Sequence, residues 1–391
     1  MIRRISLTLL LSFVFYLLSS QPDNPVRVRI YAGDDPHYIF FRVASGQYTI
    51  DSFNGQPVIV RSGELFIISR FYDRIALKFM NHTGYLSDSL KISSSAPEAS
   101  FMLRTSSSSP VYRNYSGDLE CFPDLGSLLL INTMNIEDYV AGVVKAEGGS
   151  GKNEEYFKTQ AVIARTYTYR YFGKHIPDGY NLCDDTHCQV FNGITSDALI
   201  NASVKHTSGQ VAVTSDSSLI ISAFHSNCGG ETSPSEYVWL SAHPYLVRVV
   251  DPYCVTSKNA TWEKRVSLNE WAEMLSRNGY KEPADSAKQF LFRQRIRVQD
   301  YVTGQFKIPF SRIRIELGLR SSWFSVSEQD DSLLLTGKGY GHGVGLCQEG
   351  AMVMASAGKK FQEILKFYYP GAGVVGIEAV KKDRDERKQS N

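Results

Sequence analysis

Hydrophobic and polar residues alternate along the first quarter of the chain. From Val26 to Tyr31 apolar residues occupy every second position, which is typical of a strand with one buried face. Similar short runs follow between turns rich in Gly, Asp and Asn, at Tyr38–Val43, Val58–Arg61, Leu65–Ser69 and Ile75–Met80. This pattern predicts a small β-rich N-terminal domain over residues 21–124, with a Ser-rich loop at 106–110.

After a short apolar strand at Leu128–Asn132, the hydrophobic residues no longer alternate but have the spacing of a helix. Asn135 is a good helix N-cap, and the glycine pair at 148–149 is a stop signal. Between them, apolar residues spaced three and four apart share one helix face: Ile136, Tyr139, Val140, Val143 and Val144. The pattern predicts a helix that ends close to Glu147.

The rest of the chain contains segments with the hydrophobic spacing of helices and segments with the alternation of strands. Helices are expected at 154–172, 268–278 and 361–369, a strand pair at 211–224, and strands at 313–316 and 333–336. The fold class is therefore α+β: the β-rich domain precedes a second domain, 125–375, in which helices pack on a mixed sheet. The charged tail at 376–391 has too few apolar residues for a core and is expected to be disordered.

The first 20 residues have the pattern of a signal peptide. Arg3 and Arg4 precede an apolar stretch from Ile5 to Leu18, which is shorter than the roughly 20 residues of a membrane span. An uncleaved anchor is the alternative, because Leu18 is not the small residue that cleavage favours. We expect an exported protein of the periplasm or cell envelope, with no membrane span after the signal sequence.

Composition excludes one class of partner. The net charge of +2 over 391 residues is far from the strongly basic balance of nucleic-acid-binding proteins, so no nucleic acid is expected as a partner. Export allows the six cysteines to form disulfides, although their spacing alone does not determine which residues pair.

Glu147 is the first candidate for chemistry. It lies at the end of the predicted helix, where the last carbonyl groups carry partial negative charge, so its pKa should rise. A general acid that works near neutral pH needs such a shift. From the local sequence alone, a solvated loop glutamate is the favoured interpretation.

Several motifs follow one another along residues 128–373, at Asn135–Glu147, Lys158–Tyr167, Asp185–Phe191, Phe224–Gly230, Val238–Trp239, Pro244–Leu246, Asp251–Pro252, Gly318–Ser321, Gly337–Ala351 and Tyr368–Gly371. In this order they resemble the SpoIID/LytB family, and the resemblance favours a catalytic role for Glu147. The resemblance implies a lytic transglycosylase. Such an enzyme cleaves the β-1,4 bond between N-acetylmuramic acid and N-acetylglucosamine in peptidoglycan and leaves 1,6-anhydro ends, with Glu147 as catalytic acid and base.

A single carboxylate suffices for this reaction, because the sugar's own 6-hydroxyl group is the nucleophile, whereas ordinary glycosidases use two carboxylates. Asp251, Glu231 and Glu349 are the other candidates, and a structural role is expected for each. No cofactor is required for the chemistry. The partners implied are peptidoglycan glycan strands and, in the alternative function, a cell-wall amidase that a non-catalytic member of the family would stimulate.

A cluster at 183–188 combines zinc-ligand residue types. Cys183, His187 and Cys188 lie within six positions, and the resemblance adds an upstream histidine, for which His175 is the candidate. A structural zinc and a Cys183–Cys188 disulfide are equally consistent with the sequence.

Two further cysteines stand where the family has Ser or Thr. This departure suggests a Cys228–Cys347 disulfide, which leaves Cys121 and Cys254 to pair by elimination. A peptidase that uses Cys228 as nucleophile with His225 is a third hypothesis for the function.

The segment from Gly339 to Gly345 has alternate glycines but not the Lys-Ser/Thr ending of a phosphate loop. Tight bends beside a bound sugar chain fit better. With the resemblance, this predicts a glycan-binding cleft formed by Arg165, Tyr167, Gln189, His225, Gly229, Gly230, His342 and Gln348. For the two histidines, hydrogen-bonded packing is the alternative. For Arg165, Tyr167 and Gln189 the alternative is a structural tie between the second helix and the sheet.

Overall fold

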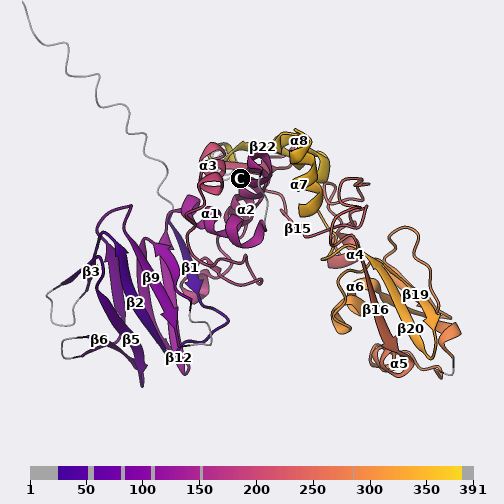
Figure 1. Cartoon of the computed structure of the whole chain (residues 1–391), viewed down its shortest axis with the longest axis horizontal. Helices are drawn as coiled ribbons and strands as arrows, with labels where there is room; N and C mark the ends of the chain where they lie inside the picture. Colours follow the sequence, from indigo (N-terminus) through magenta and orange to yellow (C-terminus); the bar gives the residue numbers. More distant parts are fainter. Residues whose placement is uncertain are drawn as a thin grey trace, which may run out of the picture.

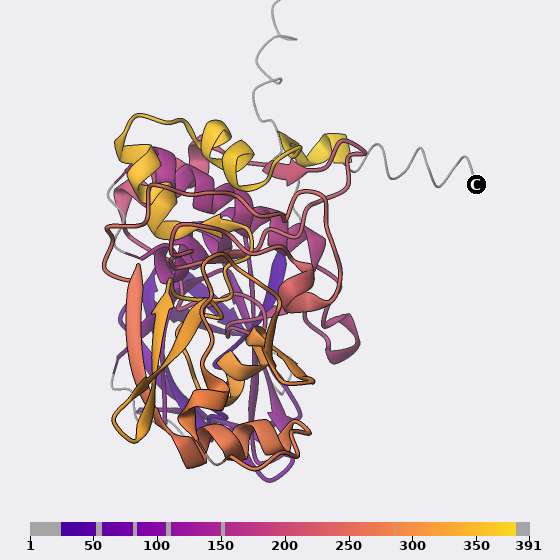
Figure 2. The same ribbon diagram turned by 90° about the vertical axis from the view of Figure 1, so that its right-hand side faces the viewer.

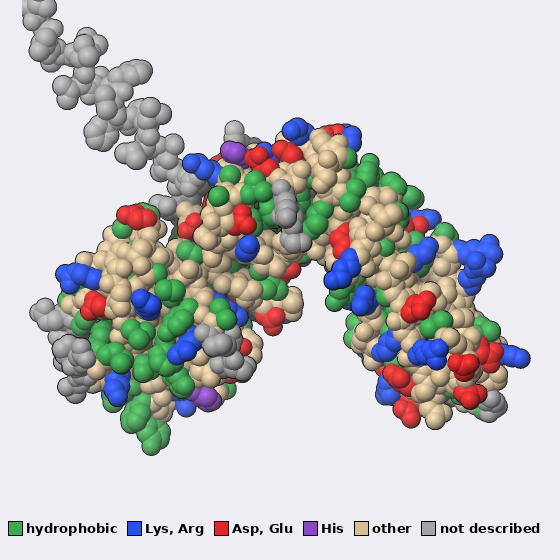
Figure 3. Space-filling model, in the orientation of Figure 1, with side chains coloured by type: hydrophobic (Ala, Val, Ile, Leu, Met, Phe, Trp, Pro, Cys, Tyr) green, Lys and Arg blue, Asp and Glu red, His purple; other side chains and the backbone are tan. Residues whose placement is uncertain are grey.

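The structure, a computed structural model, describes residues 25–380 except 52–56, 81–83, 107–110, 150–152 and 285. The predicted signal peptide and the tail from Lys381 lie outside the described residues. The described chain forms an arch, in which a strand-rich part and a smaller lobe hang from a central helical layer (Figures 1 and 2). The space-filling view shows an open hollow beneath the central layer, between these two parts (Figure 3).

The strand-rich part consists of two sheets that enclose an aromatic core. Phe41 stacks between Phe66 and Phe101, with ring centroids 4.7 and 4.8 Å away. The first sheet has the order β13-β1-β12-β11-β8-β3-β4: β1 Val26–Ile30, β3 Gln47–Ile50, β4 Val58–Arg61, β8 Leu90–Ser94, β11 Asp118–Asp124, β12 Ser127–Met134 and β13 Leu182–Cys183. The second has the order β10-β9-β2-β5-β6-β7: β2 Tyr38–Ser45, β5 Leu65–Phe71, β6 Arg74–Phe79, β7 Tyr85–Ser87, β9 Ser100–Thr105 and β10 Arg113–Ser116.

The structure divides the chain differently from the predicted boundary at 124/125. That boundary falls in the turn of the β11–β12 hairpin, whose strands pair from Asp118 with Thr133 to Asp124 with Ser127. Strand β1 pairs with both β12 and β13, so the first strand and the segment at 182–183 share a sheet. One continuous hydrophobic core accordingly joins the strand-rich part to the central layer.

The central layer holds the helices on which the site depends. They are α1 Ile136–Glu147, α2 Glu154–Arg170, η1 Ile176–Asp178, α3 Ala198–His206, α4 Glu236–Trp239, α7 Gln348–Ser356 and α8 Phe361–Tyr368. The predictions of α1, α2 and α8 are confirmed, with α2 two residues shorter than expected, whereas α3 and α7 were not predicted. Two short strand pairs complete the layer: β14 Gln210–Val213 with β22 Gly373–Gly376, and β15 Phe224–His225 with β21 Leu346–Cys347.

The predicted strand pair at 211–224 is wrong in its pairing. Strand β14 pairs with β22 near the C-terminus, and only a single bridge joins Val213 to Leu219. The two-residue strand β15 pairs in parallel with β21. The local alternation predicted a hairpin between these strands. In the structure β14 pairs instead with a strand more than 150 positions away.

Residues 260–338 form a separate part, called here the inserted lobe. Its core is a cluster of its own around Trp271, Phe290 and Leu335, which the sequence analysis did not predict. Its elements are β16 Thr261–Ser267, α5 Leu268–Arg277, η2 Ala287–Phe290, β17 Asp300–Thr303, β18 Phe306–Pro309, α6 Phe310–Glu316, β19 Phe324–Gln329 and β20 Ser332–Lys338. The predictions of α5 and β20 are confirmed.

The predicted strand at 313–316 is instead part of helix α6. Phe310, Ile313 and Leu317 are buried and lie three and four positions apart, which places them on one helix face. A short Ile-Arg-Ile-Glu segment alternates in hydrophobicity, and the spacing to Phe310 and Leu317 reveals its helical period only over a longer window.

The α+β fold class is confirmed by these mixed sheets and packed helices. At the end of the described chain, Ile377 and Val380 pack against Val211 and Val213, so this part of the predicted tail belongs to the fold. None of the helices in the described ranges combines the length and apolar character needed to cross a bilayer.

Candidate active site around Glu147

Glu147 is the last residue of helix α1. Asn135 caps the helix at its start by accepting a hydrogen bond from the Glu137 amide at 2.8 Å. At the other end, the amide of Gly148 donates to the Val144 carbonyl at 2.8 Å, and the chain then leaves the helix. The predicted position of Glu147 at the helix end is therefore confirmed.

Two segments distant in sequence hold Glu147. The backbone amide of Val190 donates to Glu147 Oε1 at 2.8 Å. Gln348 Nε2, at the start of α7, donates to the carbonyl oxygen of Glu147 at 2.7 Å. Among the described residues, no group hydrogen-bonds Oε2, so one carboxyl oxygen is held while the other is available.

Burial sets the protonation of this carboxyl group. Glu147 is half-buried, and desolvation raises its pKa above the usual 4.5, while the Val190 amide stabilises the carboxylate and limits the rise. The direction agrees with the sequence prediction. The leading cause is burial, whereas the sequence analysis had assigned the shift first to the helix terminus.

The segment that carries Val190 is fixed against α1 by an aromatic contact. Phe191 lies between Tyr115 of β10 and Tyr139 of α1, with ring centroids 6.1 and 5.0 Å away. A side chain at Gly142 would bring a Cβ atom within 2.3 Å of the Phe191 ring, so only glycine allows this approach. The close packing explains why the Val190 amide reaches the end of α1.

The other three candidate carboxylates are engaged in structural contacts. Glu231 binds Arg248, with 2.5 Å between Oε2 and Nη2. Glu349 accepts hydrogen bonds from the amide groups of Asn227 and Asn259, both at 2.5 Å. Asp251 is fully buried and accepts from Tyr368 Oη at 2.9 Å. These contacts agree with the structural roles that the sequence analysis expected.

Four predicted metal ligands come together as the Cys/His cluster: His175, Cys183, His187 and Cys188. Their ligand atoms all lie within 4.8 Å of one another. Cys183 Sγ is 3.7 Å from His187 Nδ1, and Cys188 Sγ is 3.5 Å from His175 Nε2. Zn–N and Zn–S bonds of about 2.0 and 2.3 Å place tetrahedral ligands roughly 3.3 to 3.8 Å apart, so the four residues fit zinc.

The surroundings of the Cys/His cluster also suit a metal. His175 offers Nε2 to the cluster, and its Nδ1 lies 3.1 Å from Asp178, the carboxylate partner that orients many metal-binding histidines. Asp184 accepts from the amides of Tyr31 and Ala32 at 2.6 and 2.9 Å, which ties the cluster loop to β1. Cys188 precedes Val190 by two positions, so the cluster adjoins the donor to Glu147.

Three of the other buried cysteines lie together, which brings the predicted partners Cys228 and Cys347 close to each other but separates Cys121 from Cys254. Cys228, Cys254, Cys347 and Asp251, called the Cys/Asp cluster, have ligand atoms within 4.8 Å of one another. Cys254 lies 3.3 Å from Cys228 between Sγ atoms, whereas Cys121 lies in β11 within the first sheet. Pairing of Cys121 with Cys254 is therefore wrong. All six cysteines belong to the described chain, and none is bonded to another.

A nucleophilic role for Cys228 does not fit this arrangement. Its side chain is fully buried, and its thiol contacts Asp251 at 3.2 Å and Cys254 at 3.3 Å. His225 directs its own hydrogen bond to the Val344 carbonyl. The peptidase hypothesis thus loses both the exposed thiol and the adjacent base that it requires.

His225 and His342 form a packed pair joined through one residue. His225 Nδ1 donates to the Val344 carbonyl at 3.1 Å, and His342 Nδ1 accepts from the Val344 amide at 3.0 Å. Burial is the first cause that lowers the pKa of both rings, to about 4 for His342. Both are neutral near pH 7, which matches the hydrogen-bonded alternative, although His225 Nε2 is buried without a partner among the described residues.

Arg165 does not line a cleft. It is fully buried, forms an ion pair with Glu137 at the start of α1, and donates to the Gln210 carbonyl at 3.0 Å. The structural alternative is therefore correct for Arg165, which ties α2 to α1 and β14. Such a buried pair is favoured because the arginine's donors are satisfied by several acceptors.

Tyr167 and Gln189 lie towards the Cys/His cluster. The half-buried Tyr167 ring stands 4.6 Å from that of Tyr171, and Cys188 is among its neighbours. Gln189 is buried and accepts from Thr168 Oγ1 at 3.3 Å, while its Nε2 has no partner among the described residues. Both side chains link α2 to the loop that carries Val190.

Gly229 and Gly230 form a left-handed turn with φ of +76° and +110°. A Cβ atom at Gly229 would lie 2.7 Å from the Cβ of Lys338, so the glycine permits the close approach of β20. The two glycines follow Cys228 directly. The structure thus assigns them a role in the turn at the Cys/Asp cluster, whereas the sequence analysis had assigned them to substrate binding.

Sequence reasoning did not predict the contacts of three residues of the site. Val190 acts through its backbone amide, which no sequence pattern marks. Asp251 had been recognised only as an acid, and its place beside three cysteines depends on tertiary structure. Trp239 is 39% exposed, and its ring lies 5.3 Å from that of His342. Trp239 belongs to the Val238–Trp239 motif of the resemblance, which was the signal that could have identified it.

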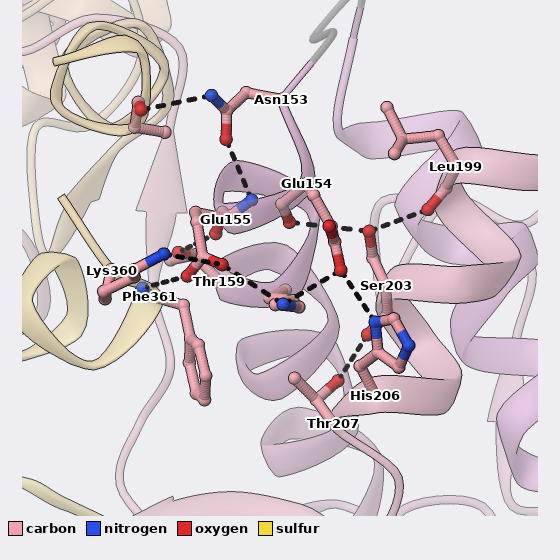
Figure 4. Close-up of polar contacts among 12 residues, drawn as sticks. Asn153, Glu154, Glu155, Thr159, Leu199, Ser203, His206, Thr207, Lys360 and Phe361 are labelled. Atoms are coloured by element: carbon pink, nitrogen blue, oxygen red, sulfur yellow. Dashed lines mark hydrogen bonds and ion pairs between the residues drawn. The ribbon is translucent and has the colours of Figure 1, made fainter. Parts of the chain in front are cut away.

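A polar network at the start of α2 fixes the helices around the site (Figure 4). Asn153 accepts from the Glu155 amide at 2.9 Å and donates to the Ala355 carbonyl of α7 at 3.1 Å. Glu155 accepts from the Phe361 amide of α8 at 2.9 Å, and Glu154 binds His206 of α3 at 2.7 Å. Helix α7, whose first residue is Gln348, is therefore held at its far end as well.

Comparison with known proteins agrees with this arrangement. A family profile described as SpoIID, Stage II sporulation protein, matches residues 124–213, which include α1, α2 and the Cys/His cluster. An uncharacterized protein of Brachyspira hyodysenteriae is 32% identical over 69% of this chain and 74% of its own length.

Two Bacillus subtilis proteins are also similar. Stage II sporulation protein D is 30% identical over 69% of this chain and 79% of its own length. A protein named Amidase enhancer is 29% identical over 59% of this chain but only 39% of its own length. The extent of these matches shows that the chain is a member of the SpoIID/LytB family.

Proposed function

We propose that the protein is a peptidoglycan lytic transglycosylase in which Glu147 is the catalytic acid and base. Membership of the SpoIID/LytB family supports a function in the cell wall. The observation that carries the finer proposal is the state of Glu147. It is half-buried, its pKa is raised, and one of its carboxyl oxygens has no partner among the described residues.

The reaction follows from one carboxyl group. Protonated Glu147 donates its proton to the glycosidic oxygen, and the bond from that oxygen to C1 of N-acetylmuramic acid breaks. The 6-hydroxyl group of the same sugar then attacks C1, and its proton passes to the Glu147 carboxylate. The products are a 1,6-anhydro end and a free 4-hydroxyl end, and Glu147 returns to its starting state.

The surrounding residues support this use of Glu147. Val190 and Gln348 orient the carboxyl group and the backbone that carries it, which is the preorganisation that proton transfer needs. Glu231, Asp251 and Glu349 are all engaged, so no second carboxylate competes for the role among the candidates. A zinc ion in the Cys/His cluster would be structural, because four protein ligands leave no open position.

A second function is supported by one of the relatives. The Bacillus subtilis protein named Amidase enhancer matches 59% of this chain. In that function the protein would bind glycan strands and stimulate a cell-wall amidase without cleaving them. Both functions place the protein outside the cytoplasmic membrane, which agrees with the predicted signal peptide.

Digestion of purified glycan strands, with and without stem peptides, distinguishes the two functions. Mass analysis of the ends should reveal 1,6-anhydro ends with the wild-type protein and none with Glu147→Gln. Glu273→Gln, at an exposed position on α5, makes the same chemical change away from the site and should retain activity. Hydrolysed reducing ends, or anhydro ends that persist in Glu147→Gln, would overturn the proposal. Amidase stimulation by a wild-type protein that leaves strands intact would favour the second function.

A further inference from the structure

We propose that Cys228, Asp251, Cys254 and Cys347 form a second, structural zinc site at the root of the inserted lobe. This site is separate from the Cys/His cluster and does not depend on the proposed enzymatic activity. Its ligands come from three segments: the turn after β15, the loop before β16, and the end of β21.

The distances within the cluster suit a small tetrahedral ion. Cys228 Sγ lies 3.3 Å from Cys254 Sγ and 3.2 Å from Asp251 Oδ2, and all four ligand atoms lie within 4.8 Å of one another. Zinc bound by thiolate and carboxylate at about 2.3 and 2.0 Å requires ligand separations of roughly 3.3 to 3.8 Å. Small adjustments of side chains would therefore close the site around the ion.

Burial and composition favour a metal over a disulfide in the Cys/Asp cluster. All four side chains are fully buried, and a buried carboxylate is costly unless it is paired or binds a metal. Three thiols cannot all form disulfides with one another, and Cys121 lies apart in β11. Sulfur ligands in a four-residue set select zinc over the harder cations magnesium and calcium.

Outer contacts support the ligands as they do in metal sites. The amides of Cys228 and Gly350 donate to Cys347 Sγ at 3.3 and 3.4 Å, as expected around a thiolate. Cys347 is also the N-cap of the nine-residue helix α7, where a negative charge is favoured. Asp251 Oδ1 accepts from the Tyr253 amide at 2.8 Å, and Tyr368 donates to Oδ2.

The position of the cluster gives the ion a structural task. The chain leaves the central layer after Cys254, forms the inserted lobe, and returns shortly before Cys347 (Figure 1). Arg297 of the lobe donates to the Cys228 carbonyl at 2.7 Å and the Glu231 carbonyl at 2.8 Å. An ion bound here would join both connections of the lobe to the start of α7, one residue before Gln348.

The metal content of the purified full-length protein tests this inference by elemental mass spectrometry. One zinc equivalent should be lost in the double variant Cys228→Ser/Cys347→Ser and kept in Cys183→Ser/Cys188→Ser, whatever the Cys/His cluster binds. Asp251→Asn should release zinc to a chelator faster than the wild type. Cys121→Ala is the matched control for a buried cysteine and should leave the zinc content unchanged.

A second measurement covers the case in which the variants do not fold. Unfolding of the wild-type protein with a chelator, but without reductant, should make Cys228, Cys254 and Cys347 all available to alkylation. A disulfide between any two of them would leave that pair protected and would overturn the inference. A zinc content that does not change in Cys228→Ser/Cys347→Ser would also overturn it.

Discussion

The Cys/His and Cys/Asp clusters each end within two positions of a residue that hydrogen-bonds Glu147, but the two clusters are built in different ways. The Cys/His cluster comes from one continuous segment, in which His175 and Cys188 are 13 positions apart. The Cys/Asp cluster joins segments 119 positions apart at Cys228 and Cys347. The first adjoins Val190, which binds the side chain of Glu147, and the second adjoins Gln348, which binds its backbone.

This difference shows what each cluster contributes. A local cluster shapes one loop, and its removal frees only that loop. A cluster made from distant segments closes a long stretch of chain, and here it also fixes the inserted lobe to the central layer. The entropy of loop closure rises with the length of chain enclosed, so the two clusters should differ in their effect on stability.

The largest expected effect comes from disrupting each cluster in turn. A cross-link over about 15 residues stabilises by roughly 3 kcal/mol, and one over about 100 residues by roughly 4.7 kcal/mol. Cys228→Ser/Cys347→Ser should therefore lower the free energy of unfolding by about 2 kcal/mol more than Cys183→Ser/Cys188→Ser. Denaturant titration of the purified proteins measures both. Equal losses, or a greater loss at the Cys/His cluster, would contradict this difference between the clusters.

A smaller effect is expected at the residue that links the Cys/Asp cluster to Glu147. Gln348→Met keeps the size of the side chain and removes the donor to the Glu147 carbonyl. The hydrogen bond that is lost contributes about 1 kcal/mol. The rate of strand cleavage should fall about five-fold, which corresponds to that energy. Gln305→Met, at an exposed position of the inserted lobe, is the control. An unchanged rate in Gln348→Met would show that this contact does not position Glu147.

The smallest expected effect is on stability, because a charged carboxylate at the half-buried Glu147 disfavours folding. The pKa of Glu147 is raised in the folded state. This group therefore contributes to the stability of the fold below its usual pKa of 4.5, and that contribution is lost as the pH rises through the raised value. Glu147→Gln should therefore be slightly more stable than the wild type at pH 7, with the difference vanishing near pH 4. Thermal unfolding at the two pH values measures this. A destabilised variant at pH 7 would mean that the ionised carboxylate contributes to folding.

The same contrast explains how much could be predicted from the sequence. The alternating strands, helix α1 and its end at Glu147 follow from local patterns and were confirmed. The four residues of the Cys/His cluster were identified because three of them are sequence neighbours and the resemblance supplied His175. Local spacing and residue type carried all of these predictions.

What could not be predicted depends on tertiary contacts. Cys254 was paired with Cys121 by elimination, yet it meets Cys228 because two loops converge on β21. Arg165 was placed in the cleft, but its ion pair with Glu137 keeps it in the interior. The separate core of the inserted lobe also went unnoticed, because its strands and helices resemble those around it in period and composition.

The pH dependence of anhydro-end formation tests the central claim most directly. Glu147 must be protonated to act as the acid, so the wild-type rate should be high below its raised pKa and fall as the pH rises through it. Glu147→Gln should give no anhydro ends at any pH. A wild-type rate that stays constant as the carboxyl group ionises, or cleavage by Glu147→Gln, would contradict the assignment of Glu147 as the catalytic acid.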